Sequence, residues 1–252
     1  SQKSFIKLAK NGKAYMKEAP VLWCTECQTS IAQAELDIIE KDTTFNYILF
    51  KITGKKLGEY QKEQKLGAQL GEQLTEQSGE ELAEQLDEEF NEQSYSQQLK
   101  EHLIVATTRP ELLFGCVCLF VNPKDDRYKQ YIGGTAIVPL YNYEIPILAD
   151  DKVSIDKGTG VVMCATFGDS TDAKWYETYK LPYRKVILPD GTIDRNVPFI
   201  GGLKITAARK QIIELLLANK LLIESKSIIH AVAVHERCGK QIEILPSKQW
   251  YI

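Results

Sequence analysis

Apolar positions along the chain fall mostly into short runs that are broken by turn residues, a pattern typical of β-strands. The run FNYILFKI at residues 45–52 predicts a strand that is buried on both faces. Similar runs lie on both sides of TTRPE (residues 107–111), in TAIVPLYNYEIPILAD and in the last 25 residues. Short strands with few helices between them predict a mixed, mainly antiparallel α/β domain, barrel-like, with peripheral helices.

Two segments instead carry helical signals. STDAKWYETYK at 170–180 predicts a helix with Asp169 or Ser170 as its N-cap, because both residue types accept hydrogen bonds from free backbone N–H groups. LKITAARKQIIELLLANKLL at 203–222 repeats apolar residues at helical spacing and predicts the clearest helix, with Thr206 as its cap.

The composition changes sharply at 58–100, which is rich in Glu, Gln and Gly. Leucines at four-residue spacing favour an amphipathic helical hairpin, while the glycines favour disorder, so we expect a surface insertion of either kind. Residues 59–92 carry eleven acids and two lysines, a net charge of −9. With −3 overall, the rest of the chain is +6, which suits a nucleic-acid partner.

Several protein classes do not fit the sequence. No run of about 18 apolar residues predicts a membrane span, and the first residues lack the apolar core of a signal peptide. Six scattered cysteines do not form the pattern of a disulfide framework, so we expect a cytoplasmic, reducing location. The GTG at 158–160 lacks the Gly-Lys-Ser/Thr ending of a phosphate-binding loop.

The stretch GTGVVMCATFGDSTDAKW, residues 158–175, combines a glycine turn, an apolar run and two aspartates. Asp169 and Asp172 come where the predicted strand ends and a helix begins. Capping of the helix and pairing with its dipole would explain both residues structurally. A carboxylate at the mouth of a pocket is also suited to holding an ammonium group, so the second aspartate is a candidate binding residue.

A second polar segment, ATTRPELLFG, follows an apolar strand that Pro110 ends. Thr107 and Thr108 offer hydroxyl groups that can position a water or a ligand hydroxyl. Arg109 offers a planar fork for phosphate or carboxylate. Ordinary polarity at the edge of a strand is the alternative interpretation.

Four residues near the chain ends have the spacing of zinc ligands. Cys24-x-x-Cys27 and His235-x-x-Cys238 together supply the donor set of a tetrahedral site. A metal-free knuckle that joins the two ends of the chain is the alternative. We expect the three remaining cysteines to pack as small apolar residues; they are Cys116, Cys118 and Cys164.

Taken together, PVLWCTECQTSIAQAELD, ATTRPELLFG, IPILADDKVSIDKGTGVVMCATFGDSTDAKW and VHERCGKQIEILPSKQWYI resemble the editing domain of class I aminoacyl-tRNA synthetases, and the valine enzymes most. The resemblance covers nearly the whole chain except about 58–100. The adenylate-forming HIGH-like and KMSKS-like motifs of those ATP-binding ligases are absent. The resemblance therefore implies that 1–252 is an editing domain from a larger synthetase, with 1–30 and 230–252 as its incoming and outgoing strands and knuckle.

This resemblance implies a function and residue roles. Editing domains hydrolyse the ester of a mischarged tRNA, here threonyl-tRNA(Val), without a cofactor. Asp172 would hold the α-ammonium group, and Asp169 would accept the threonine hydroxyl. Thr107, Thr108 and Arg109 would hold the terminal adenosine, its ribose and the ester. The implied partners are the acceptor end of tRNA(Val) and the rest of the synthetase.

The sequence departs from a common bacterial pattern of the family, which has a lysine and a threonine in the strand and a histidine before the first aspartate. Met163, Ala165 and Gly168 stand there instead, which puts more weight on Asp169, helped by Thr166. Two other functions stay open. One is editing for a leucine or isoleucine enzyme, and the other is a non-catalytic module that binds a tRNA end.

Overall fold

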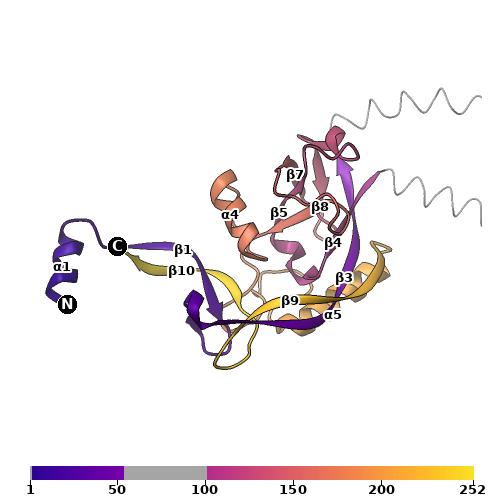
Figure 1. Ribbon diagram of the computed structural model, residues 1–252. Helices are drawn as coiled ribbons and strands as arrows, with labels where there is room; N and C mark the ends of the chain where they lie inside the picture. The colour runs from indigo at the N-terminus through magenta and orange to yellow at the C-terminus, as the bar shows by residue number, and fades with distance from the viewer. Residues whose placement is uncertain (1, 54–100) are drawn as a thin grey trace, which may run out of the picture.

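A computed structural model describes residues 2–53 and 101–252 (Figure 1). The predicted insertion at 58–100 lies outside these residues. Within the described residues, no helix is long and apolar enough to cross a membrane.

The body of the molecule is a seven-stranded mixed sheet curled into a half-barrel, which confirms the predicted fold class (Figure 1). The strand order is β4-β3-β6-β7-β5-β8, and β9 pairs with the outer part of β3. Among the strand pairs of the described residues, β5 and β7 alone run parallel to each other. Thr159 Oγ1 donates to Ile104 O at 2.6 Å, which joins the turn before β8 to β4. The strands are β3 (Leu36–Thr53), β4 (His102–Thr107), β5 (Cys116–Val121), β6 (Thr135–Ile137), β7 (Glu144–Ala149), β8 (Val161–Ala165) and β9 (Leu222–His235).

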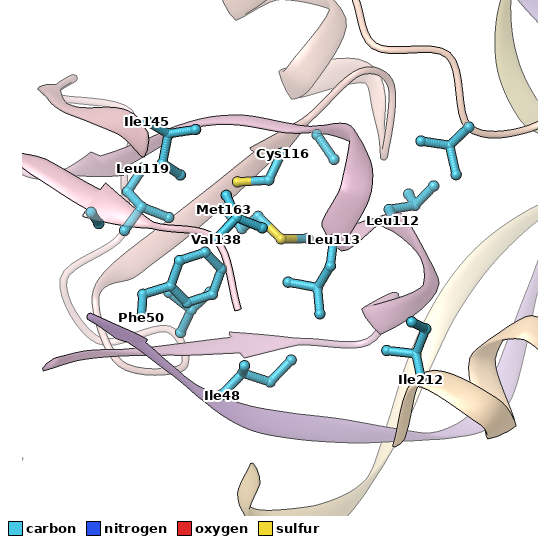
Figure 2. Packing of buried hydrophobic residues seen from close by; sticks show 14 of the residues in the cluster. Ile48, Phe50, Leu112, Leu113, Cys116, Leu119, Val138, Ile145, Met163 and Ile212 are labelled. Carbon is cyan, nitrogen blue, oxygen red and sulfur yellow. The ribbon is translucent and has the colours of Figure 1, made fainter. Parts of the chain in front are cut away.

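The core explains why the central strands read as apolar runs. Every residue of β5 is buried, because its side chains are divided between two hydrophobic clusters on the two faces of the strand. Leu119 packs in the larger cluster with Ile48 and Phe50 of β3, while Phe120 stacks on Trp175 of the smaller one. Figure 2 shows the larger cluster enclosed by strands of the half-barrel. Burial of this apolar surface is the main driving force for the fold.

A second, three-stranded sheet joins the two ends of the chain. It has the order β10-β1-β2, with β1 (Tyr15–Cys24), β2 (Thr29–Ser30) and β10 (Glu243–Tyr251). The antiparallel register of β1 and β10 runs from Tyr15 opposite Tyr251 to Trp23 opposite Glu243. In Figure 1 this ribbon extends away from the half-barrel and carries α1 (Gln2–Lys10) at its outer end. The segments predicted as incoming and outgoing strands thus lie side by side, and their exact boundaries stay a prediction.

Two helices cover the half-barrel, and one predicted cap is wrong. α4 (Ser170–Tyr179) has Asp169 as its N-cap, one of the two alternatives that the sequence left open. α5 (Ile205–Ala218) begins after Lys204 without any side-chain cap, so the predicted cap at Thr206 is wrong. Lys204 forms a β-bridge with Thr192, and the chain turns into the helix directly after it, which places Thr206 already inside the first turn. The short 3-10 helices are η1 (Gln33–Glu35), η3 (Pro110–Gly115) and η4 (Lys129–Tyr131).

Two isoleucines of β3 provide a matched test of this core. Ile48 is fully buried, whereas Ile38 in the same strand is 76% exposed. We expect Ile48→Ala to lower the free energy of unfolding by about 2–5 kcal/mol, because it removes buried methyl groups and leaves a cavity. Ile38→Ala should change it by less than about 0.5 kcal/mol. Urea unfolding followed by circular dichroism measures both, and equal effects would contradict this description of the core.

Candidate functional site

The two aspartates lie in an acidic corner between the end of β8 and the first turn of α4, defined here as residues 166–172. Asp169 is exposed, and its Oδ1 accepts hydrogen bonds from the backbone N–H groups of Thr171 (2.7 Å) and Asp172 (2.9 Å). These bonds satisfy N–H groups that have no partner inside a helix. The capping role considered from the sequence is therefore present in Asp169.

Asp172 is different, because its side chain turns back into the protein. The residue is only 6% exposed, and Oδ2 accepts a hydrogen bond from the N–H of Gly168 at 2.9 Å. Cys164, on β8, lies near this carboxyl group, and its thiol favours the ionised form. Burial raises the pKa of Asp172 to about 8, and the nearby charge of Asp169 adds to the shift. No cationic group contributes to this shift, and no ion pair with Asp172 is formed among the described residues.

Gly168 leaves no room for a side chain. A Cβ atom at this position would lie 2.5 Å from Asp172 Oδ2, inside the contact distance of real atoms. The backbone of Gly168 is also held from the other side, because Arg109 Nη1 donates to its carbonyl oxygen at 3.2 Å. A histidine at position 168 would clash with the inward-facing side chain of Asp172, so the glycine and this conformation of Asp172 go together.

The TTRPE segment connects to this corner through its arginine. Thr107 is 9% exposed, and its Oγ1 accepts the backbone N–H of Arg109 at 3.0 Å. Thr108 is partly buried between these two residues. Pro110 begins η3, so β4 ends where the sequence predicts. The structure therefore brings Arg109 to the acidic corner through Gly168, while Thr107 is bonded to the backbone of Arg109.

The guanidinium group of Arg109 is occupied by protein groups. Nε donates to Glu111 at 3.1 Å and Nη2 to Glu243 at 2.7 Å. Glu111 is fully buried and also accepts two bonds from Arg209 of α5, each of 2.8 Å. Burial alone would raise the pKa of Glu111, but the hydrogen bonds from Arg209 and the charge of Arg109 outweigh it and lower that pKa.

The remaining predicted residues of this region serve the body of the fold. The hydroxyl of Thr166 donates to Arg184 O at 3.0 Å and accepts from Arg184 N at 2.9 Å, and the residue is 3% exposed. Met163 and Ala165 lie in the larger hydrophobic cluster, where Figure 2 shows Met163 beside Val138. Polar residues at these two positions would have to be buried in that cluster, which explains why apolar residues stand there.

A small, shallow hollow that is partly open to solvent lies beside the acidic corner. Its lining includes Thr166 and Phe167 but neither aspartate. The other lining residues come from η3, from the segment after α4 and from β10; they are Leu112, Tyr183, Val186, Ile187, Ile244 and Leu245. The corner and this hollow thus share the loop at the end of β8.

A separate cluster unites the four predicted metal ligands. The donor atoms of Cys24, Cys27, His235 and Cys238 all lie within 4.8 Å of one another. Sγ of Cys24 and Cys238 are 3.5 Å apart, and Nδ1 of His235 is 3.4 Å from Cys238 Sγ and 3.6 Å from Cys27 Sγ. Tetrahedral zinc with its usual bond lengths separates such donors by about 3.5–3.8 Å. The donor set and the spacing therefore fit a metal ion.

Sequence reasoning missed four parts of the site: Glu111, Glu243, Arg209 and the thiol of Cys164 near Asp172. Glu243 stands between apolar residues in QIEILP, and an acid in an apolar run was a signal for a buried ion pair. Arg209 carried no such signal. Cys164 is fully buried as expected, and its contact with Asp172 depends on the tertiary structure.

Comparisons with known proteins bear on the family of the chain. A family model described as "Leucyl-tRNA synthetase, editing domain" matches residues 126–200. The whole chain aligns with "Valine--tRNA ligase" of Rickettsia felis at 39% identity and with that of Haloarcula marismortui at 37%. The chain belongs to the editing domains of class I aminoacyl-tRNA synthetases. Relatives along its full length are valine enzymes, which confirms the resemblance noted from the sequence.

This editing domain spans 30% of the length of the Rickettsia felis relative and 24% of the Haloarcula marismortui relative. A solved structure, "The crystal structure of GlLeuRS-CP1", covers 73% of this chain and is matched over its whole length, with 15% identity and a TM-score of 0.43.

The raised pKa of Asp172 predicts how the stability of the domain depends on pH. Because its folded-state pKa of about 8 lies above the ordinary value of 3.8, the carboxyl group stays protonated in the fold while it ionises in the unfolded chain. This group therefore lowers stability as the pH rises from about 4 to about 8, by up to about 1.4 kcal/mol per pH unit. Asp172→Asn should remove that slope in urea unfolding measured at pH 5, 6, 7 and 8.

Asp126→Asn is the control, because the Asp126 side chain is 88% exposed. This variant should keep the slope of the unsubstituted chain. Identical slopes for Asp172→Asn and Asp126→Asn would show that Asp172 is ionised in the folded domain throughout this range.

Proposed function

We propose that this domain hydrolyses mischarged threonyl-tRNA(Val) as the post-transfer editing domain of a valyl-tRNA synthetase in the cytoplasm. The similarity of the whole chain to part of the valine--tRNA ligases supports the choice of enzyme. Valine enzymes are the established example of why editing is needed: their synthetic pocket rejects the isosteric threonine only about 100-fold, so a second, hydrolytic site must remove it.

The observation that carries the proposal is the buried carboxyl group of Asp172. It already has a backbone N–H donor from Gly168, and it lacks a positive partner among its described contacts. The α-ammonium group of an aminoacyl ester would supply that charge and favour the ionised form of the carboxyl group. Binding would then give a charge-assisted hydrogen bond in a partly desolvated place, where such bonds are strong.

Asp169 is the proposed reader of the threonine side chain. Both backbone bonds of this residue end on Oδ1, and in the proposal Oδ2 accepts the hydroxyl hydrogen of threonine. Valine has a methyl group there and cannot donate. Asp169 is exposed in the free domain, so in the proposal the bound ester covers it. A covered acceptor left unpaired costs about 1–3 kcal/mol, which would disfavour valyl-tRNA(Val) in the editing site.

The proposed chemistry needs no protein nucleophile. A water molecule adds to the carbonyl carbon of the ester, and the bond from that carbon to the ribose oxygen then breaks. The ribose oxygen takes up a proton, with the neighbouring ribose hydroxyl assisting, and threonine leaves. The contribution of Asp172 is to hold the reacting group in place, which is a large part of many rate enhancements.

Thr107, Thr108 and Arg109 are proposed to lie along the terminal adenosine and its ribose. Their position at the end of β4, linked to the acidic corner by the bond from Arg109 to Gly168, supports this placement. Thr166 is proposed to hold the loop of the acidic corner in place, because its hydroxyl donates to the carbonyl oxygen of Arg184 and accepts from the N–H of Arg184.

One observation favours a second candidate. The family model that matches residues 126–200 is that of the leucyl-tRNA synthetase editing domain. Editing of a different mischarged amino acid, by a leucine or isoleucine enzyme, is therefore the alternative to test beside threonine.

We also propose that the cluster of Cys24, Cys27, His235 and Cys238 holds a structural zinc ion. The spacing of its donor atoms supports this assignment. All four positions of a tetrahedral site are filled by protein, which is the composition of structural rather than catalytic zinc. The ion would join the end of β1 to the turn after β9 and stabilise the junction of the two sheets.

Deacylation tests the proposed function directly. The domain should release threonine from threonyl-tRNA(Val) and spare valyl-tRNA(Val), and Asp172→Ala should reduce the threonine rate by at least about 100-fold, because an anchoring charge is lost. Ser170→Ala, an exposed change in the same helix turn, is the control and should keep the rate.

The assay also separates the alternatives. Faster release of an amino acid other than threonine from its mischarged tRNA would indicate a leucine or isoleucine enzyme. If a folded domain and the full-length synthetase that contains it both fail to hydrolyse any of these esters, the catalytic proposal is wrong. Binding of tRNA without turnover would then indicate the non-catalytic module.

The zinc assignment has its own test. The purified domain should contain about one zinc per chain by atomic emission, and Cys238→Ser should lose most of it. A chelator should lower the midpoint of thermal unfolding, because the ion binds only the folded cluster. Cys118→Ala, a buried cysteine outside the cluster, should retain its zinc. A domain that contains no metal after expression with added zinc would contradict the assignment.

A further inference from the structure

The acidic corner depends on a residue from the far end of the chain. Arg109 uses each of its three nitrogens for a different partner: Nε for Glu111, Nη1 for the carbonyl of Gly168 and Nη2 for Glu243. A planar guanidinium with three fixed directions can satisfy all three partners at once, whereas a lysine ammonium has no such fork. The orientation of the group is thus set by its two carboxylate partners.

The two carboxylates are not equivalent. Glu111 is shared, because Arg209 donates two bonds to it. Glu243 has Arg109 as its ion-pair partner among the described residues, at 2.7 Å, and its side chain is 4% exposed. Burial raises the pKa of Glu243, and the charge of Arg109 opposes that shift. Loss of Glu243 would leave the Nη2 group of a buried guanidinium without its acceptor.

The backbone of Gly168 is hydrogen-bonded to both Arg109 and Asp172, so it links the positions of the two side chains. Its carbonyl accepts from Arg109, and its N–H donates both to Ala165 O at 3.0 Å and to Asp172 Oδ2. A Cβ would strike the same carboxylate oxygen, so the peptide and the carboxylate are in direct contact. Any shift of this peptide must therefore move or weaken the bond to Asp172.

We propose that Glu243 is a positioning residue for the acidic corner and acts on Asp172 through Arg109 and Gly168. Its consequence for substrate binding rests on the proposed editing function. Glu243 begins β10 and lies opposite Trp23 of β1, so the corner is tied to the ribbon that joins the two chain ends. The geometry makes Arg109 a clamp on the protein backbone as well as a neighbour of the substrate.

Hydrogen exchange at the amide of Gly168 tests this inference without RNA. In Glu243→Gln the amide should exchange about tenfold faster, because a lost contact of this kind is typically worth a factor of this size. Core amides of β3 should keep their rates, since they report global unfolding. A merely structural role for Glu243 would accelerate both sets of amides together.

Glu35→Gln is the matched control, because it also removes a carboxylate from an arginine, the 2.9 Å pair with exposed Arg237. It should leave the exchange at Gly168 unchanged. If Glu243→Gln does not fold, Glu243→Asp keeps the charge and withdraws the carboxylate by one methylene, with the same expected result. Unchanged exchange at Gly168 in a folded variant at position 243 would overturn the inference.

The kinetic consequence follows from the same variant. Glu243→Gln should raise KM for threonyl-tRNA(Val) about tenfold and change kcat less, because it disturbs the ammonium anchor more than the attacking water. An altered kcat with unchanged KM would contradict the positioning role. If the unsubstituted domain shows no hydrolysis while Gly168 exchange responds as expected, the proposed function fails and the positioning of the corner by Glu243 stands.

Discussion

The hydrogen bond from the N–H of Gly168 to the buried carboxyl group of Asp172 is the contact on which the rest of the site depends. It turns the second aspartate away from solvent, and burial then raises the pKa of that group to about 8. A protein does not ordinarily bury an acid without a positive partner, because the charged form loses its hydration. The same bond requires a residue without a side chain at position 168, so the local sequence and the electrostatic character of the site have one cause.

The half-barrel supplies the rigid frame for this contact. The acidic corner follows directly after β8, which is buried in the core. Arg109 follows β4, which stands at the other end of the strand order. Glu243 then ties both to the ribbon of β1 and β10, which extends from the half-barrel in Figure 1. Buried ion pairs of this kind rarely add much stability, since desolvation offsets their attraction. Their geometry is specific, however, and that suits a site in which one peptide must be held in place.

The features that the sequence predicted correctly are those that depend on neighbouring residues or on residue spacing. The apolar runs predicted the strands, Asp169 appeared as a cap, and the spacing of Cys24, Cys27, His235 and Cys238 predicted a cluster that the fold does assemble. Thr206 was a plausible cap by residue type, but the β-bridge of Lys204 fixed where α5 begins. The pairing of Arg109 with Glu243 was out of reach, because Glu243 is 134 residues away in sequence and only the packing of the two sheets brings them together.

The central claim is that Asp172 receives the ammonium group of the aminoacyl ester. The most direct measurement is a crystal structure of the domain with a threonyl-adenosine analogue in which an amide replaces the labile ester. The account predicts the ammonium nitrogen about 2.7–2.9 Å from the Asp172 carboxylate, with the threonine hydroxyl at Asp169. An analogue bound with its ammonium group away from Asp172, and with that carboxyl group still bonded only to protein, would contradict it.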